Sequence, residues 1–425
     1  MRIYHLSNLI KSYAFTSLIT ASFFAGIFCI IGCSKNDAIS IIPSTSATTG
    51  STTSTAIDPY AAIKITFGTA IDPNSLENYA NQGQPAYILK NNLGANTITD
   101  KTATLGRVLF YDKNLSINNT ISCSSCHKQN FAFGDTAVVS AGVESGLTIR
   151  HSMRLINTRF ANEAKFFWNE RAANLNTQTT MPIQDHLEMG FSGENGRGNL
   201  ATLLSKLSNI SYYKELFKFT FGDTVVTENR IQTSLASFIR SIQSFDSKYD
   251  IGRAQVNNDN QAFPNFTAIE NQGKNLFITA PVFNAAGLRT TGGLGCNVCH
   301  NAPEFDIDPN TLNNGIIGIA NSATGIDITN TRAASLRDIT NASGVVNTPM
   351  MHTGVLRSLR AVINHYNTIN LNPRNTNLDP RLRPGGNGQN LNVTEAEIAA
   401  VVAFMQTLGG TNVYVNKKWS NPFLN

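Results

Sequence analysis

Apolar side chains recur at three- and four-residue steps along four segments, the spacing of one face of an α-helix. These segments span residues 201–219, 229–249, 356–366 and 394–408. Thr394 and Glu397 form a capping-box pattern at the start of the last segment. Alternation typical of strands is weak, and Asn, Gly and Pro fill the stretches between the helices. The pattern predicts a mainly α-helical protein with long loops.

The first 33 residues follow a different pattern. Arg2 and Lys11 precede a mostly apolar run that ends in Ile-Ile-Gly-Cys33. A charged start, a hydrophobic centre and small residues are typical of a signal peptide, and the run ends like the lipobox of bacterial lipoproteins. A membrane-anchoring helix is the alternative, because roughly 20 apolar residues can span a bilayer. We therefore predict a signal peptide at 1–33 with a lipid anchor on Cys33, and a folded part in the cell envelope, facing the periplasm or at the surface.

The rest of the chain divides into a tether and two domains. Residues 34–56 are rich in Ser and Thr, which is typical of a flexible tether. At 425 residues the chain is too long for one ordinary domain, so we predict domains at 57–255 and 256–425. A faint repeat supports this division, because Gly-x-x-Leu-Phe, a loop and a cysteine unit follow one another in 106–127 and again in 273–300.

Composition and charge exclude some classes of protein. Hydrophobic residues make up 41% of the chain and charged residues 14%, which fits a globular protein. The net charge is +5, and removal of the leader leaves 31 basic against 28 acidic residues. This excess is too small for an electrostatic nucleic-acid binder. We predict no nucleic-acid partner, and a membrane contact only through the N-terminal anchor.

The cysteines carry the chemistry. Of the six, Cys29 and Cys33 lie in the leader, and the other four form two Cys-x-x-Cys-His units. Their positions are Cys123, Cys126 and His127, then Cys296, Cys299 and His300. A zinc site would bring the two pairs within roughly 15–20 residues of each other, whereas 170 positions separate Cys126 from Cys296.

Cys-x-x-Cys-His is the attachment signature of c-type haem. A redox dithiol, by contrast, does not require the histidine. Two copies that use every remaining thiol of an exported chain predict two c-type haems, with His127 and His300 as the iron ligands.

Several stretches resemble the bacterial dihaem cytochrome c peroxidases and their MauG-type relatives, in matching order and spacing from about residue 105 to 409. They are "LGRVLFYDKNLS", "SCSSCHKQNFAFGD", "FFWNERAANLNTQ", "PIQDHLEMG", "CNVCH", "SLRDITNASGVVNTPMMHTGVLRSLRAVINHY" and "VVAFMQTLGG". The resemblance implies two cytochrome c-like domains with one haem in each. The first haem would react with peroxide, and the second would store or relay electrons.

The resemblance also implies roles for three residues around the first haem. Glu188 matches the distal acid/base carboxylate, and Gln178 matches the distal glutamine. A carboxylate above an open iron site can move the proton that peroxide cleavage requires. Trp168 matches a tryptophan between the two haems and would relay electrons. A surface charge for Glu188 and core packing for Trp168 are the plainer interpretations.

The sixth ligand of the second haem is a methionine in the peroxidases and a tyrosine in the MauG type. Counting 14 residues from His352 reaches Tyr366, which would share an inward helix face with Leu359 and Ile363. His365 lies about 100° away from that face. We favour Tyr366, with Met350, Met351, His352 and His365 as alternatives. Phenolate ligation favours oxidised iron, so we expect peroxide to react with the resting diferric protein.

The chain departs from the family at three places. The loop 135–150 contains no histidine that could block the first iron, so that site is expected to be open at rest. His151 replaces the asparagine whose carbonyl helps to bind an inter-haem calcium, which leaves one calcium ion as a prediction. Trp168-Asn-Glu-Arg171 replaces Trp-Asp-Gly-Arg, so the turn after the tryptophan is expected to differ.

Three functions remain open. The leading prediction is an exported peroxidase that reduces hydrogen peroxide to water, with electrons from a small redox protein or another donor passing through the second haem. The alternative is a MauG-like enzyme that uses peroxide to oxidise a residue of a partner protein. A plain dihaem electron carrier is less favoured, because a carrier needs no acid over an open iron.

Overall fold

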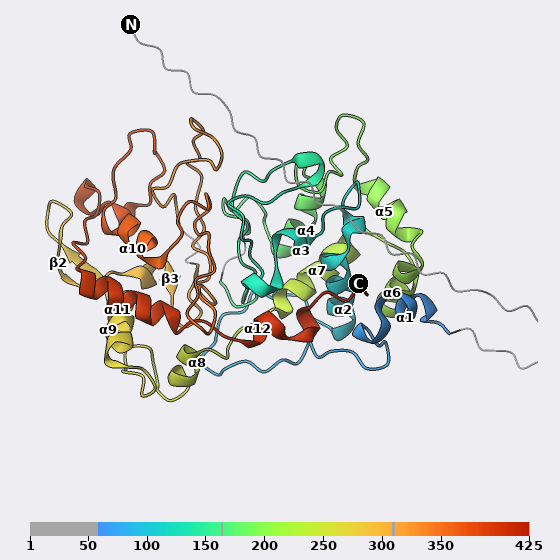
Figure 1. Ribbon diagram of the computed structural model, residues 1–425, viewed down its shortest axis with the longest axis horizontal. Coiled ribbons are helices and arrows are strands. Elements are labelled where there is room, and N and C mark those ends of the chain that lie inside the picture. The colour runs from blue at the N-terminus through green and yellow to red at the C-terminus, as the bar shows by residue number, and fades with distance from the viewer. Residues whose placement is uncertain (1–57, 163–164, 308–310, 425) are drawn as a thin grey trace, which may run out of the picture. The chain divides into compact units, whose positions relative to one another are not determined.

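The computed structural model describes residues 58–162, 165–307 and 311–424, and it is rich in helices (Figure 1). The predicted signal peptide, the lipobox Cys33 and the tether lie outside the described residues. The helices are α1 Ala61–Phe67, α2 Asp100–Tyr111, α3 Cys123–Cys126, α4 Leu175–Gln184, α5 Leu200–Ser208, α6 Ser211–Phe221, α7 Glu228–Ser241, α8 Lys248–Arg253, α9 Ala268–Ile278, α10 Leu359–Asn367, α11 Glu395–Gln406 and α12 Asn412–Val415. The strands are β1 Pro281–Phe283, β2 Arg289–Gly292, β3 His300–Asn301 and β4 Asp306–Ile307, in two short antiparallel pairs. The predicted mainly α class is confirmed.

The repeat seen in the sequence corresponds to two similar helix pairs. Helix α2 packs on α7, and α9 packs on α11. A Cβ atom on Gly106 of α2 would lie 1.9 Å from the Ser234 carbonyl oxygen, and one on Gly273 of α9 would lie 1.9 Å from that of Ala400. Only glycine allows each pair to approach so closely. The aromatic ring four residues after each glycine then packs on the partner helix, with centroids 5.2 Å apart for Phe110–Phe238 and 5.3 Å for Phe277–Phe404.

Each helix pair lies in its own buried core. The first core contains α2, α4 and α7 and consists mostly of residues between 63 and 242. The second contains α9, α10 and α11 and runs from 249 to 408. Figure 1 shows these two groups of helices, with the short α8 between them along the chain. The domain boundaries 57–255 and 256–425 stay a prediction, since residues 57–425 form one compact unit.

The C-terminal segment 412–424 returns to the first core. Val413 and Trp419 are buried there, and Trp419 is only 1% exposed. Hydrogen bonds from the side chains of Tyr79, Tyr111 and Arg107 reach main-chain oxygens of residues 418, 419 and 420 at 2.6–2.7 Å. Residues from both predicted domains therefore build the first core.

Two of the predicted helices are shorter than their apolar patterns. The segment 201–219 forms α5 and α6, because Asn209 ends the first of them and its side chain hydrogen-bonds to the Ser205 carbonyl at 2.9 Å. The segment 229–249 stops being helical at Ser241. Beyond it, the Asn157 amide exchanges two hydrogen bonds with the main chain of Ser244, at 2.8 and 3.0 Å, and holds this stretch extended. The capping box of Thr394 and Glu397 on α11 is confirmed.

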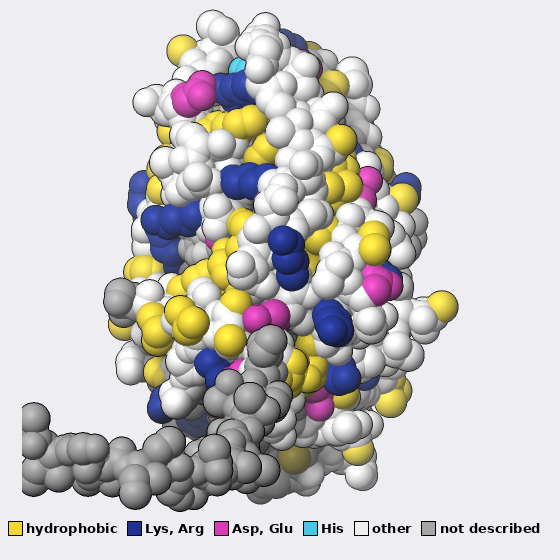
Figure 2. Space-filling view, turned by 90° about the vertical axis from the view of Figure 1, so that its right-hand side faces the viewer, with side chains coloured by type: hydrophobic (Ala, Val, Ile, Leu, Met, Phe, Trp, Pro, Cys, Tyr) yellow, Lys and Arg dark blue, Asp and Glu magenta, His cyan; other side chains and the backbone are white. Residues whose placement is uncertain are grey.

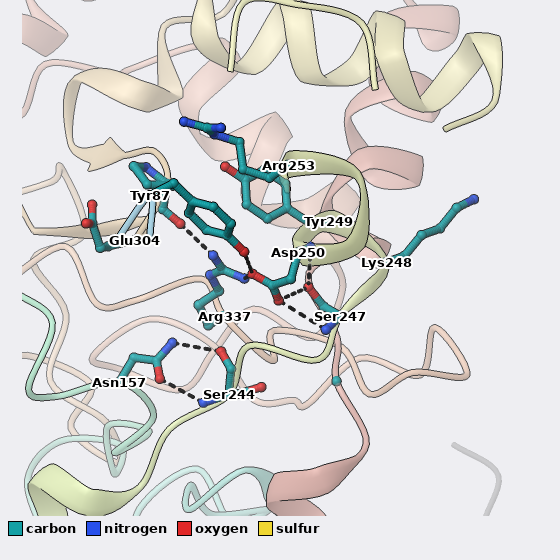
Figure 3. Close-up of polar contacts among 12 residues, drawn as sticks. Tyr87, Asn157, Ser244, Ser247, Lys248, Tyr249, Asp250, Arg253, Glu304 and Arg337 are labelled. Atoms are coloured by element: carbon teal, nitrogen blue, oxygen red, sulfur yellow. Dashed lines mark hydrogen bonds and ion pairs between the residues drawn. The ribbon is translucent and has the colours of Figure 1, made fainter. Parts of the chain in front are cut away.

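A buried ion pair joins segments that lie far apart in the sequence (Figure 3). The Arg337 side chain, 0% exposed, donates to Asp250 Oδ1 at 2.7 Å, and Tyr87 Oη donates to the same oxygen at 2.8 Å. The other Asp250 oxygen accepts from the Ser247 main chain and hydroxyl. The guanidinium also packs against the ring of Tyr249, 4.8 Å away. This network ties residue 87 to the start of the second core.

The surface agrees with the modest net charge. On the face in Figure 2, Lys and Arg side chains are spread among hydrophobic and uncharged polar ones. Within the described residues, no helix has both the length and the apolar character needed to cross a membrane.

Candidate functional site

Each Cys-x-x-Cys-His unit lines a cavity of its own. The first cavity, of about 180 Å³, is lined by Cys123, Cys126 and His127. The second cavity, of about 490 Å³, is lined by Cys296, Cys299 and His300. Ligand pockets typically have volumes of about 300–1,000 Å³. The second cavity falls within this range, and the volume of the first cavity is below it. The four cysteines form no disulfides, so their thiols remain available for attachment.

The first attachment unit has protonated thiols and a histidine whose tautomer suits metal binding. Helix α3 carries both cysteines, and burial raises the pKa of Cys123 to about 12 and of Cys126 to about 11. His127 Nδ1 lies 3.1 Å from the Phe133 carbonyl oxygen, which can only accept. Nδ1 therefore carries the hydrogen, and the lone pair of the ring is on Nε2, the arrangement of a metal-binding histidine.

The second attachment unit has the same donor set. Cys296 begins a 3₁₀ turn after β2, and His300 begins β3. Burial lowers the pKa of His300 to about 4, so the imidazole is neutral at pH 7 and can act as a ligand. Burial raises the pKa of Cys296 to about 12. Two thiols and one neutral imidazole on each cavity wall fit a covalently attached haem.

Glu188 and Gln178 both line the first cavity with His127. Gln178 is carried by α4, whose N-terminus is capped by the Asn174 side chain. Glu188 lies in the turn after α4. Its N–H donates to Asp185 Oδ1 at 3.1 Å, and its carbonyl accepts from the Val143 N–H at 3.0 Å. The structure thus brings together the two residues that the sequence pairs on the distal side.

The Glu188 carboxyl has an unusual proton affinity. Burial raises its pKa to about 7, the nearby Asp185 carboxylate adds to the rise, and the Arg171 guanidinium opposes it. A group with a pKa near the working pH can both accept and donate a proton. Glu188 can therefore hold or release a proton near neutral pH, and its role as the distal acid/base stays a prediction.

Trp168 lines both cavities. Its Nε1 donates to the His151 carbonyl at 2.7 Å, and its own carbonyl accepts from the Arg332 N–H at 2.8 Å. Glu170, at the position of the family's glycine, has a φ of 58°, in the left-handed region that favours glycine. Trp168 is thus held by two main-chain hydrogen bonds on a wall of both cavities, and its role as an electron relay stays a prediction.

The candidate sixth ligands differ in position. The second cavity is lined by Tyr366, Met350 and Met351, together with Leu359, Val362 and Ile363 on the same face of α10. The Asn314 amide nitrogen lies 3.4 Å from Tyr366 Oη and 3.7 Å from Met351 Sδ, so these two rivals are neighbours. Burial raises the pKa of the Tyr366 hydroxyl.

Neither alternative histidine lines the second cavity. His365 Nε2 is engaged with the Asn314 carbonyl oxygen at 2.9 Å. His352 is 2% exposed, and its ring lies 6.2 Å from that of Trp168. Tyr366 and the two methionines are therefore the better placed candidates.

Calcium stays a prediction. In the described part of the chain, no cluster of three or more His, Cys, Asp or Glu side chains could hold a metal ion. The His151 carbonyl, the ligand expected from the resemblance, accepts a hydrogen bond from Trp168. A carbonyl oxygen has two lone pairs, so this bond leaves one for a cation.

Sequence reasoning missed the charged residues around the cavities. Asp185 and Arg171 act on Glu188, and Arg154 and Arg332 line both cavities. Arg154 is the only charged residue between 151 and 158, and a lone arginine in a sequence is an ordinary surface signal. Only the fold shows that these side chains point inward.

The chain is similar in sequence to known proteins. The model of the di-haem cytochrome c peroxidase family matches residues 100–258. MauG, the methylamine utilization protein of Methylophilus methylotrophus, is 28% identical over 322 residues, which cover 74% of this chain and 84% of that protein. The cytochrome c551 peroxidase of Nitrosomonas europaea is 27% identical over 326 residues, covering 72% and 80%.

Solved structures agree. A MauG-like protein associated with microbial copper homeostasis has a TM-score of 0.61 at 26% identity, over 80% of this chain and 99% of that one. The diheme peroxidase BthA of Burkholderia thailandensis, at 20% identity and a TM-score of 0.55 over 80% of this chain and 94% of that one, shares the fold. The predicted resemblance is confirmed: residues 100–258 match the di-haem cytochrome c peroxidase family, and most of the chain is similar to MauG and to a cytochrome c551 peroxidase, which are oxidoreductases.

Proposed function

We propose that this protein is an exported peroxidase that reduces hydrogen peroxide to two molecules of water, consuming two electrons and two protons. The electrons come from a small redox protein or a similar donor and enter through the second cavity. Haems attached at Cys123/Cys126 and Cys296/Cys299 would supply the iron redox chemistry, with His127 and His300 as ligands. The remaining steps fall to side chains of this chain.

One observation carries the proposal: Glu188, with a pKa of about 7, shares a cavity with Gln178 and with the first attachment unit. As a carboxylate, Glu188 accepts the proton of one peroxide oxygen, and as an acid it returns that proton to the oxygen that leaves as water. The Gln178 amide can donate a hydrogen bond to peroxide and orient it. A plain electron carrier has no use for this pair.

The test is Glu188→Gln in the haem-loaded protein. General acid/base groups contribute about 10²–10⁴-fold, so peroxide turnover should fall by at least ~10²-fold. Glu194→Gln, at an exposed position in the same loop, is the matched control and should keep full turnover. Wild-type turnover in Glu188→Gln would refute this role.

We further propose that Tyr366 is the sixth ligand of the second haem, and that the diferric protein reacts with peroxide without prior reduction. Its support is the position of Tyr366 on the cavity wall, on the inward face of α10. Tyr366→Phe should change the ferric spectrum of the second haem, whereas Met351→Leu should not. The reverse result would assign the neighbouring methionine instead.

The second candidate function is peroxide-driven oxidation of a residue in a partner protein. It is favoured by the similarity to two MauG proteins, at 28% and 26% identity. Steady turnover with a reduced small cytochrome supports the peroxidase. Slow turnover, together with a peroxide-dependent mass change in a co-expressed partner, would support the alternative.

Export and a lipid anchor belong to the same proposal. The leader 1–33 would be removed, leaving a lipid on Cys33 and a tether at 34–56. Mass spectrometry of the N-terminal peptide from the native host should find an acylated Cys33. A Cys33→Ser variant should leave the membrane fraction, and unchanged fractionation would argue against the anchor.

A further inference from the structure

One short segment forms a wall of both cavities. Residues 151–154 line the first cavity and the second, and so does Arg332, which approaches from the other half of the chain. The Arg332 main chain is bonded to Trp168, and its guanidinium lies 4.9 Å from the ring of Phe166. The segment therefore places Arg154 where it can reach both sites.

Arg154 has little compensation for its charge within the described residues. One terminal nitrogen donates to the Ser335 carbonyl at 3.1 Å. Its Nε is buried and has no hydrogen-bond partner there, and no ion pair joins the side chain to a described carboxylate. Burial lowers its pKa, which Tyr414 and Asp338 only partly offset.

Arg337, an arginine that lines neither cavity, shows the contrast. Arg337 is 0% exposed and pairs with Asp250 at 2.7 Å, whereas Arg154 is half-buried and pairs with no described carboxylate. A buried cation without a counter-ion is costly, and proteins pair such charges or neutralise them with a ligand. An arginine that lines a cavity with donors to spare is suited to a planar, two-oxygen anion such as a carboxylate.

We infer that Arg154 is an anion site shared by the two cavities, and that its ligands are the carboxylate side groups of the two haems. The inference rests on haem occupancy, as in the proposed function. Thioether attachment would use the vinyl groups of a haem and leave its carboxylates unmodified, so each haem would carry anions that Arg154 could bind. Arg154 would then bind both cofactors from the wall that the two cavities share.

Such a cation also acts on redox chemistry. Reduction of iron adds negative charge, and a nearby guanidinium favours the reduced form by Coulomb attraction in a poorly solvated site. Loss of the charge should lower the midpoint potentials of both haems. A fall in both midpoint potentials would distinguish an electrostatic role of Arg154 from a role in packing alone.

The experiment is a spectroelectrochemical titration of the haem-loaded protein without peroxide, after the haem content per chain has been measured. We expect both midpoint potentials to fall in Arg154→Met and to stay near wild type in Arg154→Lys. Arg159→Met is the matched control: Arg159 follows five residues later and lines neither cavity, so its loss should change nothing. Unchanged potentials in Arg154→Met, or a fall at one haem only, would overturn the shared site.

A second neutral variant keeps the test decisive if Arg154→Met does not load haem. If Arg154→Met takes up no haem, Arg154→Gln is titrated in its place. Loss of haem in both neutral variants, with full loading of Arg154→Lys, supports the anion site, whereas equal loss in Arg154→Lys overturns it. The proposed function fails separately, because Glu188→Gln should lose peroxide turnover and keep wild-type potentials.

Discussion

The proton affinity of Glu188 predicts how peroxide reactivity depends on pH. An ordinary glutamate has a pKa of 4.5, and burial together with Asp185 raises that of Glu188 to about 7. The base form is required to take the proton from peroxide, so reactivity should be lost as pH falls through this value. Each pH unit below the pKa lowers the carboxylate fraction about tenfold. The rate at pH 5 should therefore be about one hundredth of the plateau above pH 8, whereas an unshifted glutamate would lose less than about half of it.

The measurement is the second-order rate constant of the diferric protein with peroxide, by stopped flow from pH 5 to 9 at constant ionic strength. Asp185→Asn is the informative variant, because its amide oxygen can still accept from the Glu188 N–H while the negative charge is gone. Its midpoint should move to lower pH. The residual rate of Glu188→Gln should not show this midpoint. Equal wild-type rates at pH 5 and pH 8 would refute the reasoning.

Three further predictions concern the charge beside Glu188, the packing of its turn and the buried ion pair of Arg337. Arg171→Gln removes the charge that opposes the rise in the pKa of Glu188, so the midpoint should move to higher pH, opposite to Asp185→Asn; a shift in the same direction would contradict the electrostatic account. Gly142→Ala would place a Cβ atom 1.8 Å from the Leu187 carbonyl oxygen and displace the Glu188 turn, so peroxide reactivity should fall, while Gly318→Ala, with open space around it, should react like wild type in the same stopped-flow assay. Asp250→Ala leaves Arg337 buried without its partner and should lower the free energy of unfolding by about 3–5 kcal/mol in denaturant titration. Lys64→Ala, which breaks an exposed pair, should leave the free energy of unfolding nearly unchanged.

Local patterns predicted the features that depend on local chemistry. The periodicity of residues 394–408 and the capping box of Thr394 gave α11 nearly to the residue, because both signals act within a few positions. The repeated Gly-x-x-Leu-Phe located two equivalent helices, since a glycine that admits a partner helix recurs at the same place. The Cys-x-x-Cys-His units marked both cavities.

Features that depend on distant residues could not be read in the same way. Residues 242–244 continue the predicted helical segment but are not helical, and the side chain of Asn157, more than 80 residues earlier, hydrogen-bonds to the main chain of Ser244. The sequence favoured Tyr366 as the sixth ligand, but it could not show that Met351 lies near Asn314 beside it on the wall of the same cavity. Arg154 gave no signal, because its importance comes from the two cavities that meet around it.

The return of residues 412–424 to the first core has a consequence for synthesis. A ribosome makes Trp419 only after both attachment units and every other helix, yet this indole fills a place among residues made more than 150 positions earlier. The half that is translated first is thus the half that is finished last. A fragment that ends at residue 255 would lack the packing of residues 412–424 on the first core. The two halves should therefore be produced as one polypeptide rather than recombined from separate pieces.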